Sequence, residues 1–539
     1  MKIVDLPVIK GESERQILFI SIVLAIFILV RVFFHTGLIN CQSQDDGLYL
    51  AYSRALIRGN LDFPTGLLNE KYVNPVLVPK LRLGMLFPTA IFIKIIGLRD
   101  FGSAFFPFIS SILLFFVTLA FCRLLFKKNT EMQIISILLL TFFPLNVIYS
   151  TRIMPDVPLT LFATLGVLLF LIGEKKRKNY FFVLSGISIG IGYLIKELAV
   201  IFLLFFPLYY IFLDQRKNIK SNIVKLTYIF VGFLFVYFFE TAYFYKETGA
   251  FFYRTILLKK VHLQKMEVEY GLTSPSYNLG VLNFFFSSGY DFLYHLKNML
   301  TSPLNIEFAP YGWYFFFVFI SIFYAFAYRK KEVYFLVLWF FLLYFYLEFG
   351  PTDIFIQNTN GHYVLNYFFI FKEGDASKQA NILTIPLILL IAYFLSNVSF
   401  GFRIVLLIFL VFTSLITIEK NYSFLRDGIN DTREAAMFLK SLPAKTVYTD
   451  YLASGQIEYF MGGNYSGSFV NMYGLSLEDI KNGYVIVGGS RGCDILGSTV
   501  MEMVPNFAKN PPNDWKLLKV IEGKITWYRE SNMRIYEVQ

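Results

Sequence analysis

A series of long apolar runs constrains this 539-residue chain more than any other feature. Eleven of them, each of 16 to 24 residues, lie at positions 17–34, 103–126, 132–149, 157–173, 180–195, 198–213, 223–240, 311–327, 332–349, 382–398 and 402–419. A helix of about 20 apolar residues crosses the ~30 Å hydrocarbon core of a bilayer. The composition agrees, with 56% hydrophobic residues and 16% charged residues. We therefore predict a polytopic α-helical membrane protein with about 11 spans.

The basic residues predict the orientation of these spans. The net charge is +11, but the basic residues stand in short groups between apolar runs, which is typical of cytoplasmic loops and not of nucleic-acid binding. With the N-terminus inside the cell, the basic groups all fall on the inner side: Lys127-Lys128, Lys175–Lys178, Arg216-Lys217, Arg329–Lys331 and Arg403. This holds only if the apolar run Leu83–Leu98 does not cross but lies along the outer surface. We expect a multi-pass protein of the plasma membrane.

The last 120 residues differ from the rest. Residues 420–539 are more polar, with strand-like runs at Thr446–Thr449, Tyr484–Val487 and Met533–Val538 and a helix-like run at Thr432–Ser441. The eleven spans place this stretch outside the cell. We predict a membrane domain over residues 1–419 and a small extracytoplasmic α/β domain over residues 420–539.

A pair of acids follows the first apolar run. Asp45 and Asp46 open the segment Asp45–Gly59, whose residues Tyr49 and Leu56 fall on one face at helical spacing. A charge beside the bilayer is costly unless it is partnered or functional. We interpret the segment as the catalytic loop of a membrane enzyme.

A second acid lies at the predicted outer end of the third run. Asp156 stands between Pro155 and Pro158, which break the helix and leave the carboxylate in a turn at the membrane surface. Arg152 lies four residues earlier, so an interfacial salt bridge between the two is the structural alternative. The location of Asp156 on the same face as Asp45 favours function.

A third block ends the fifth run, where Gly190 and Gly192 precede Lys196 and Glu197. Glycines in an apolar span allow neighbouring helices to approach closely. Lys196 either pairs with Glu197 as a snorkelling side chain or offers a cation to an anionic group such as a phosphate.

In this order the three blocks resemble the GT-C superfamily of polyprenyl-phosphate-sugar-dependent glycosyltransferases. The similar branch holds the dolichyl-phosphate-mannose protein mannosyltransferases and the bacterial lipid A aminoarabinose transferase. The matching residues of the first block are Asp45, Asp46, Tyr49, Ser53, Arg54, Leu56 and Gly59, followed by the run Leu83–Gly97. The later blocks match through Arg152, Asp156, Gly190, Leu194 and Lys196. The resemblance covers about residues 15–215, and the later spans follow by topology.

The resemblance implies a reaction and its residues. In this superfamily an outward Asp of the first block is the general base of an inverting transfer to an acceptor hydroxyl, and Asp45 takes that role here. Asp46 and Asp156 would position the acceptor or bind a divalent cation such as Mg²⁺ or Mn²⁺. Tyr49, Arg54, Arg152, Lys196 and Glu197 would contact substrates. The implied partners are a lipid-linked sugar donor, membrane lipids, and an acceptor glycan, lipid or protein.

Two positions depart from the family pattern. The second acid is Asp46 instead of Glu, which shortens its reach by one methylene. The Arg-Tyr pair that often precedes a late span is missing before residue 382, so the donor contact made by that Arg would come from His362, Lys372 or Lys378.

Two other functions share some of these features. A transporter or flippase of lipid-linked sugars would also have many spans, but we would expect broken mid-membrane helices or paired repeats. A polysaccharide polymerase or ligase would also carry large external loops. The acids at one surface favour the glycosyltransferase, whereas the sugar and the acceptor are not readable from the sequence.

Overall fold

The fold is known from a computed structural model. It describes residues 14–35, 45–59, 61–63, 78–126, 129–213, 218–260, 313–328, 331–349, 351–359, 362–369 and 380–449. Towards the C-terminus it describes residues 457, 459–461, 466–472, 475–487, 507, 510–522 and 532–539.

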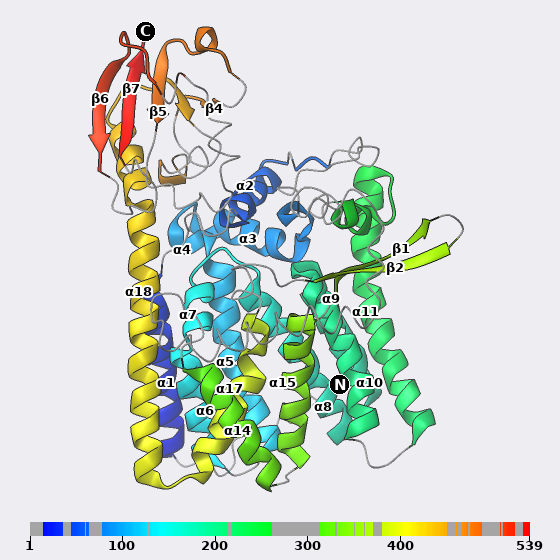
Figure 1. Cartoon of the computed structure of the whole chain (residues 1–539). Helices are drawn as coiled ribbons and strands as arrows, with labels where there is room; N and C mark the ends of the chain where they lie inside the picture. Colours follow the sequence, from blue (N-terminus) through cyan, green and yellow to red (C-terminus); the bar gives the residue numbers. More distant parts are fainter. Residues whose placement is uncertain are drawn as a thin grey trace.

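Most of the described chain is a bundle of apolar helices that run roughly side by side (Figure 1). Its members are α1 (Glu14–Phe33), α5 (Phe105–Leu125), α6 (Thr130–Phe142), α7 (Pro144–Ser150), α8 (Asp156–Lys176), α9 (Asn179–Ile195), η4 (Glu197–Val200), α10 (Ile201–Phe212), α11 (Ile219–Thr248), α14 (Tyr314–Tyr328), α15 (Lys331–Phe349), η6 (Ala380–Leu383), α17 (Thr384–Asn397) and α18 (Phe400–Lys440). Every one of the eleven apolar runs therefore contains a helix.

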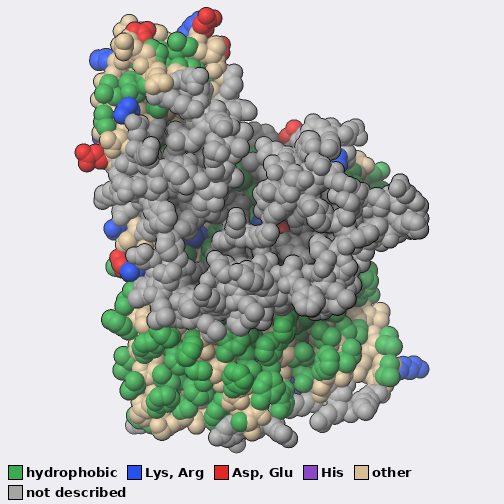
Figure 2. Space-filling view, in the orientation of Figure 1, with side chains coloured by type: hydrophobic (Ala, Val, Ile, Leu, Met, Phe, Trp, Pro, Cys, Tyr) green, Lys and Arg blue, Asp and Glu red, His purple; other side chains and the backbone are tan. Residues whose placement is uncertain are grey.

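The helices differ in their capacity to cross a bilayer. Five described helices are long and apolar enough to do so, and α6 with α7 makes a sixth if the bent pair is one span. Shorter apolar helices occupy the other predicted spans. Figure 2 shows the lower part of the molecule covered almost entirely by hydrophobic side chains, as a lipid-facing surface requires. The predicted class of polytopic helical membrane protein is confirmed.

Glycines set the closest helix contact in the bundle. A Cβ atom on Gly186 of α9 would lie 1.9 Å from the carbonyl oxygen of Ile229 on α11, and one on Gly232 would lie 2.2 Å from the carbonyl oxygen of Val183. The two backbones are therefore in contact, which side chains larger than hydrogen would prevent. This contact fixes α11 against α9, the helix that ends at Lys196.

One end of the bundle is covered by short helices. These are α2 (Asp45–Ile57), η3 (Pro79–Leu81), α3 (Leu83–Ile96) and α4 (Asp100–Ser103). In Figure 1 α2 and α3 lie at the end of the bundle from which α18 continues to the C-terminal sheet. With 14 residues α3 is about 21 Å long, short of the hydrocarbon core. The position of α3 agrees with the expectation that the run Leu83–Leu98 lies along the membrane surface and does not cross.

The C-terminal part is a five-stranded mixed sheet in the order β4-β3-β5-β7-β6. Its strands are β3 (Thr446–Thr449), β4 (Phe469–Asn471), β5 (Gly483–Val487), β6 (Lys516–Ile521) and β7 (Met533–Val538). β3 is parallel to β4 and β5, while β7 is antiparallel to β5 and β6. Ala435, Ala436 and Leu439 of α18 pack on this sheet.

The predicted boundary at residue 420 falls inside a single helix. The 41 residues of α18 run from the bundle into the C-terminal part without interruption (Figure 1). Asp100 of α4 adds a second link, because its carboxylate accepts hydrogen bonds from Tyr459 at 2.5 Å and Arg433 at 3.1 Å. The predicted helix over Thr432–Ser441 is thus the last part of α18.

Two connections between apolar runs are long, residues 241–310 and 350–381, and the structure describes only parts of them. In the first, α11 continues to Thr248 and a further helix covers residues 253–260. The second holds an antiparallel hairpin of β1 (Pro351–Thr359) and β2 (His362–Phe369), in which Ile356 pairs with Leu365.

Candidate active site

A break between two helices places two charged side chains next to each other. α9 ends at Ile195, Lys196 adopts an extended conformation with φ −158° and ψ 136°, and η4 begins at Glu197. The start of α3 lies against this break, since a Cβ atom on Gly84 would be 2.8 Å from the backbone nitrogen of Ile195. Only a glycine permits that approach, and it brings Arg82 to the break.

Lys196 forms a buried ion pair with Asp156, the first residue of α8. The Lys196 Nζ lies 2.8 Å from Oδ1 of Asp156. Lys196 is 5% exposed and Asp156 is 1% exposed, so both charges are removed from water. The second oxygen of Asp156 has no hydrogen-bond partner in the described part of the chain. Asp156 therefore keeps an acceptor position beyond the one that Lys196 uses.

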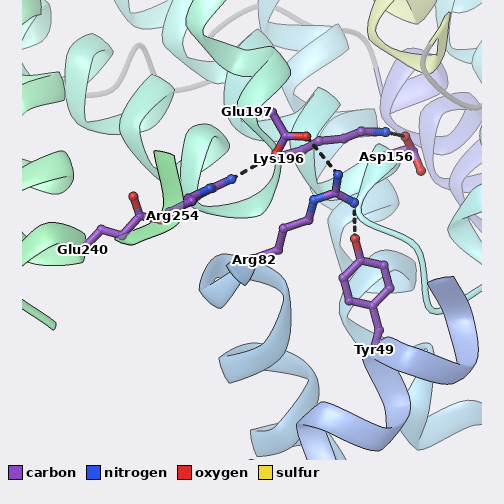
Figure 3. Close-up of polar contacts among 7 residues, drawn as sticks. All are labelled: Tyr49, Arg82, Asp156, Lys196, Glu197, Glu240 and Arg254. Atoms are coloured by element: carbon purple, nitrogen blue, oxygen red, sulfur yellow. Dashed lines mark hydrogen bonds and ion pairs between the residues drawn. The ribbon is translucent and has the colours of Figure 1, made fainter. Parts of the chain in front are cut away.

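Glu197 joins two arginines from distant segments. Its Oε1 accepts from Nη2 of Arg82 at 2.9 Å, and its Oε2 accepts from Nη2 of Arg254 at 3.1 Å. Arg254 also donates from Nη1 to Glu240 of α11 at 2.5 Å, and Arg82 donates to the hydroxyl of Tyr49 on α2. Figure 3 shows these side chains, with Asp156 and Lys196, converging from α2, the segment before α3, α8, the break between α9 and η4, α11 and the helix over residues 253–260.

The cluster combines three cations and three carboxylates. Arg82, Lys196 and Arg254 are each less than a tenth exposed. Burial alone would lower the pKa of Arg254, but Glu240 and the neighbouring groups raise it above its ordinary value. The aromatic ring of Tyr193 adds to this, with its centroid 4.4 Å from the guanidinium carbon. The three carboxylates balance the three cations in number, so an anionic group would bind these cations by taking the place of a carboxylate.

Several predicted site residues lie at or near this cluster. Tyr49 is buried and contacts Arg82, and Asp46 is fully buried one turn earlier in α2. Arg54 is in the last turn of α2 and is partly exposed. Arg152 is buried, with its guanidinium carbon 5.2 Å from the ring centroid of Tyr149. In the described residues Asp156 pairs with Lys196 and not with Arg152, and Lys196 does not pair with Glu197.

For four predicted residues the side-chain position is not described. Asp45 is the first residue of α2, as the sequence predicts, but the structure gives only its backbone. His362 is the first residue of β2, again without a described side chain. Lys372 and Lys378 lie outside the described residues.

Sequence reasoning missed three members of the cluster, Arg82, Glu240 and Arg254. Two of them had a signal, because charged residues at the edge of an apolar run are expensive unless partnered: Arg82 precedes the apolar run 83–98, and Glu240 closes the run 223–240. Arg254 lies 14 residues beyond that run and had no such signal.

A metal centre does not fit the described residues. No group of three or more His, Cys, Asp or Glu side chains among them is arranged to hold an ion. Asp156, one of the expected ligands, faces the ammonium group of Lys196, which repels a divalent cation.

Comparisons with known proteins agree with the resemblance seen in the sequence. Residues 83–239 match the model of the family described as dolichyl-phosphate-mannose-protein mannosyltransferase. The matched stretch includes Asp156, Lys196 and Glu197. No curated protein sequence matches the chain significantly.

Solved structures share the fold at low sequence identity. ArnT from Cupriavidus metallidurans bound to undecaprenyl phosphate is 10% identical with a TM-score of 0.56, covering 98% of each chain. The Archaeoglobus fulgidus oligosaccharyltransferase tethered with an acceptor peptide is 11% identical with a TM-score of 0.53, covering 94% of this chain and 73% of that one. For AglB from the same organism, with an inhibitory peptide and a dolichol-phosphate, the chain covers 64% of its length at a TM-score of 0.48, too low to define a shared fold.

The family match over residues 83–239 and the shared fold are those expected from the sequence for a membrane glycosyltransferase of the GT-C type. The resemblance predicted from the sequence is thereby confirmed. Among the solved structures, its architecture is similar to ArnT over nearly the whole length of both chains.

Proposed function

We propose that this protein transfers a sugar from a polyprenyl-phosphate-linked donor to an acceptor hydroxyl, with inversion, at the outer face of the membrane. In this proposal the N-terminus is cytoplasmic and the C-terminal sheet is extracytoplasmic. The observation that carries it is the buried cluster of Arg82, Lys196 and Arg254 at the end of the bundle that holds the sheet (Figure 3).

The three cations suit the phosphate of the donor. The lipid phosphate is bonded to the sugar in the donor and departs as the leaving group. Its departure is helped by fixed positive charge more than by a general acid. Lys196 presents three N–H donors and spends one on Asp156, and Arg82 and Arg254 are held on either side of Glu197. The donor phosphate would take the place of carboxylates as partner of these cations.

The acids take the remaining roles. Asp45, at the start of α2, removes the proton from the acceptor hydroxyl as the hydroxyl oxygen attacks the anomeric carbon. The bond from that carbon to the phosphate oxygen breaks, and free polyprenyl phosphate leaves. Asp156 has an oxygen without a partner among the described residues and would position the acceptor together with Asp46.

The test is a transfer assay with purified protein in nanodiscs and a polyprenyl-phosphate sugar labelled in the sugar. We expect release of free polyprenyl phosphate, by transfer or by slow hydrolysis to water. Asp45→Asn should lower turnover by about 10²- to 10⁴-fold, the usual contribution of a positioned base, while donor binding survives. Glu174→Gln is the matched control. It is also an acid-to-amide change, but Glu174 lies near the end of α8 that is opposite to Asp156 and the candidate site.

Two results would contradict the proposal. An Asp45→Asn protein with normal turnover would show that the acid pair only begins a helix. Movement of the intact lipid across vesicle membranes, without release of polyprenyl phosphate, would make the protein a flippase.

A further inference from the structure

A helix break deep in the bundle leaves backbone carbonyls in need of partners. α6 and α7 bend by 56° between Phe142 and Pro144. Proline has no N–H, so the carbonyl of Leu140, four residues earlier, loses its helical partner. In an apolar surrounding an unpaired carbonyl destabilises the fold strongly. Such breaks therefore persist only where other groups supply hydrogen-bond donors.

Arg31 of α1 supplies most of the donors. Its Nη1 donates to the carbonyl oxygen of Thr141 at 3.3 Å, and its Nη2 donates to that of Leu140 at 3.4 Å. Nη2 also donates to Oδ1 of Asn146 at 2.7 Å, the shortest of these bonds, which attaches α7 to the same guanidinium. Tyr314 of α14 completes the set by donating to the carbonyl oxygen of Leu139 at 3.2 Å.

The charge of Arg31 depends on this break. The side chain is 0% exposed, and no carboxylate pairs with it among the residues that the structure describes. Its partners are neutral oxygens: two carbonyls at the C-terminal end of α6, where the helix dipole places partial negative charge, the side chain of Asn146, and the carbonyl of Phe27 in its own helix at 3.2 Å. The ring of Phe27 lies 3.3 Å from the guanidinium carbon. Three of these four oxygens lie at the bend, so the bend supplies most of the partners of the buried cation.

The bend leads directly to the candidate active site. α7 ends at Ser150, and Asp156 follows six residues later. The hydroxyls of Ser150 and Thr151 donate back to the carbonyl of Val147 and hold the last turn of α7. Within the short connection the N–H of Met154 donates to the carbonyl of Arg152 at 2.9 Å. The direction of α7 therefore sets the position at which Asp156 meets Lys196.

We propose that Arg31 is a positioning residue of the transferase: it fixes the angle between α6 and α7 and thereby holds Asp156 in the acceptor side of the site. This inference rests on the proposed function, in which Asp156 positions the acceptor. Of the three cations, Lys196 pairs with Asp156, whereas Arg82 and Arg254 bind Glu197 and are carried by other elements, so donor binding depends on Arg31 less than acceptor positioning does.

The first experiment separates the two sides of the site. In Arg31→Met we expect acceptor turnover to fall by roughly 10²-fold, as for a misplacement of about 1 Å, with a much smaller change in the binding of polyprenyl phosphate. Arg31→Lys should recover part of the loss, because it keeps the charge but not the fork that spans both helices. Lys225→Met, which removes another largely buried cation, should leave turnover unchanged. Equal losses of donor binding and turnover in Arg31→Met would overturn the proposal.

A second variant separates positioning from stability. Pro144→Ala restores an N–H donor for the carbonyl of Leu140, so Arg31→Met/Pro144→Ala should regain thermal stability over Arg31→Met. Because the helix then straightens, turnover should stay low. Recovery of both stability and turnover would show that Arg31 only supports the fold.

A third measurement does not depend on activity. Arg31→Met should accelerate hydrogen–deuterium exchange of the amides from residue 145 to residue 159, with amides of α11 unaffected. If the wild-type protein neither binds polyprenyl phosphate nor transfers sugar, the proposed function fails, yet this exchange still decides whether Arg31 fixes α7. Unchanged exchange would overturn the inference alone.

Discussion

α8 and α11 carry charged side chains at both of their ends, and the two ends differ in kind. At one end are Asp156 and Glu240, in the cluster of Figure 3. At the other end, Glu174 of α8 accepts from Lys225 of α11 at 2.7 Å and from the hydroxyl of Tyr210 at 2.6 Å. Asp156 and Glu174 are 18 residues apart in one helix, which is about 27 Å.

The end with Glu174 is a closed arrangement. One acid meets one base and one hydroxyl, all from neighbouring helices, and both charged side chains are less than a fifth exposed. In the other cluster a carboxylate is shared by two arginines, and an oxygen of Asp156 has no partner in the described part of the chain. A buried ion pair alone is therefore no sign of a site. Convergence of several charges from distant segments is the better sign.

The largest effect should follow from removing Lys196. In Lys196→Met the buried Asp156 loses its counter-charge, which costs about 3–5 kcal/mol of stability. Binding of polyprenyl phosphate should weaken by about 10- to 10²-fold, as expected for the loss of a charged hydrogen bond. Thermal unfolding and lipid titration in one detergent measure the two effects.

The double variant Lys196→Met/Asp156→Leu makes this prediction sharper. Removal of both charges should restore most of the stability, but donor binding should remain weak. If the double variant binds polyprenyl phosphate like the wild type, Lys196 serves only as a partner of Asp156, and the two ends of α8 are alike.

The sequence predicted the helices and strands better than the contacts between them. The apolar runs contain the expected helices, α2 begins at Asp45, and β3 and β7 have the predicted bounds. Those features follow from local patterns of apolar residues and helix breakers. Proline is absent from α18, and this explains why the predicted terminal helix is continuous with the last span.

Local sequence patterns could not predict which charged residues pair with one another. Lys196 meets Asp156 across 40 positions, and Glu197 meets Arg82 across 115. A charge at the edge of an apolar run looks the same in sequence whether it snorkels to water or binds another charge. β6, an edge strand of the sheet, likewise lacks the regular alternation of buried and exposed residues that marks a half-buried strand.

A smaller effect, on stability alone, should follow from breaking the closed arrangement. Lys225→Met leaves Glu174 with Tyr210 as its remaining described partner, which costs about 1–3 kcal/mol. The melting temperature should fall while donor binding and turnover keep wild-type values. A loss of donor binding similar to that of Lys196→Met would show that the two ends act as one network.

The smallest effect should come from an ion pair at the surface of the sheet, whose side chains are about a quarter exposed and more accessible to water than those of both buried ends. Lys445 lies 2.9 Å from Glu537 of β7 at the surface of the sheet. The hydrogen bond from Lys445 lowers the pKa of Glu537 below its ordinary value of 4.5, and the same bond raises the pKa of Lys445 above 10.5. The lowered pKa of Glu537 means that its contribution to stability is present above pH 4.5 and is lost as the pH falls through the folded-state value.

The raised pKa of Lys445 has the opposite sign, so its contribution is present below pH 10.5 and is lost as the pH rises through its folded-state value. Between these limits Glu537→Gln should speed amide exchange in β7 only slightly, because water and salt screen an exposed pair. As the pH falls through the folded-state pKa of Glu537, the variant and the wild type should become alike, since protonation of the wild-type carboxyl removes the same charge. A difference that does not shrink as the pH falls, or an exchange rate in β7 raised as strongly as by unfolding of the sheet, would contradict the view that burial separates these pairs.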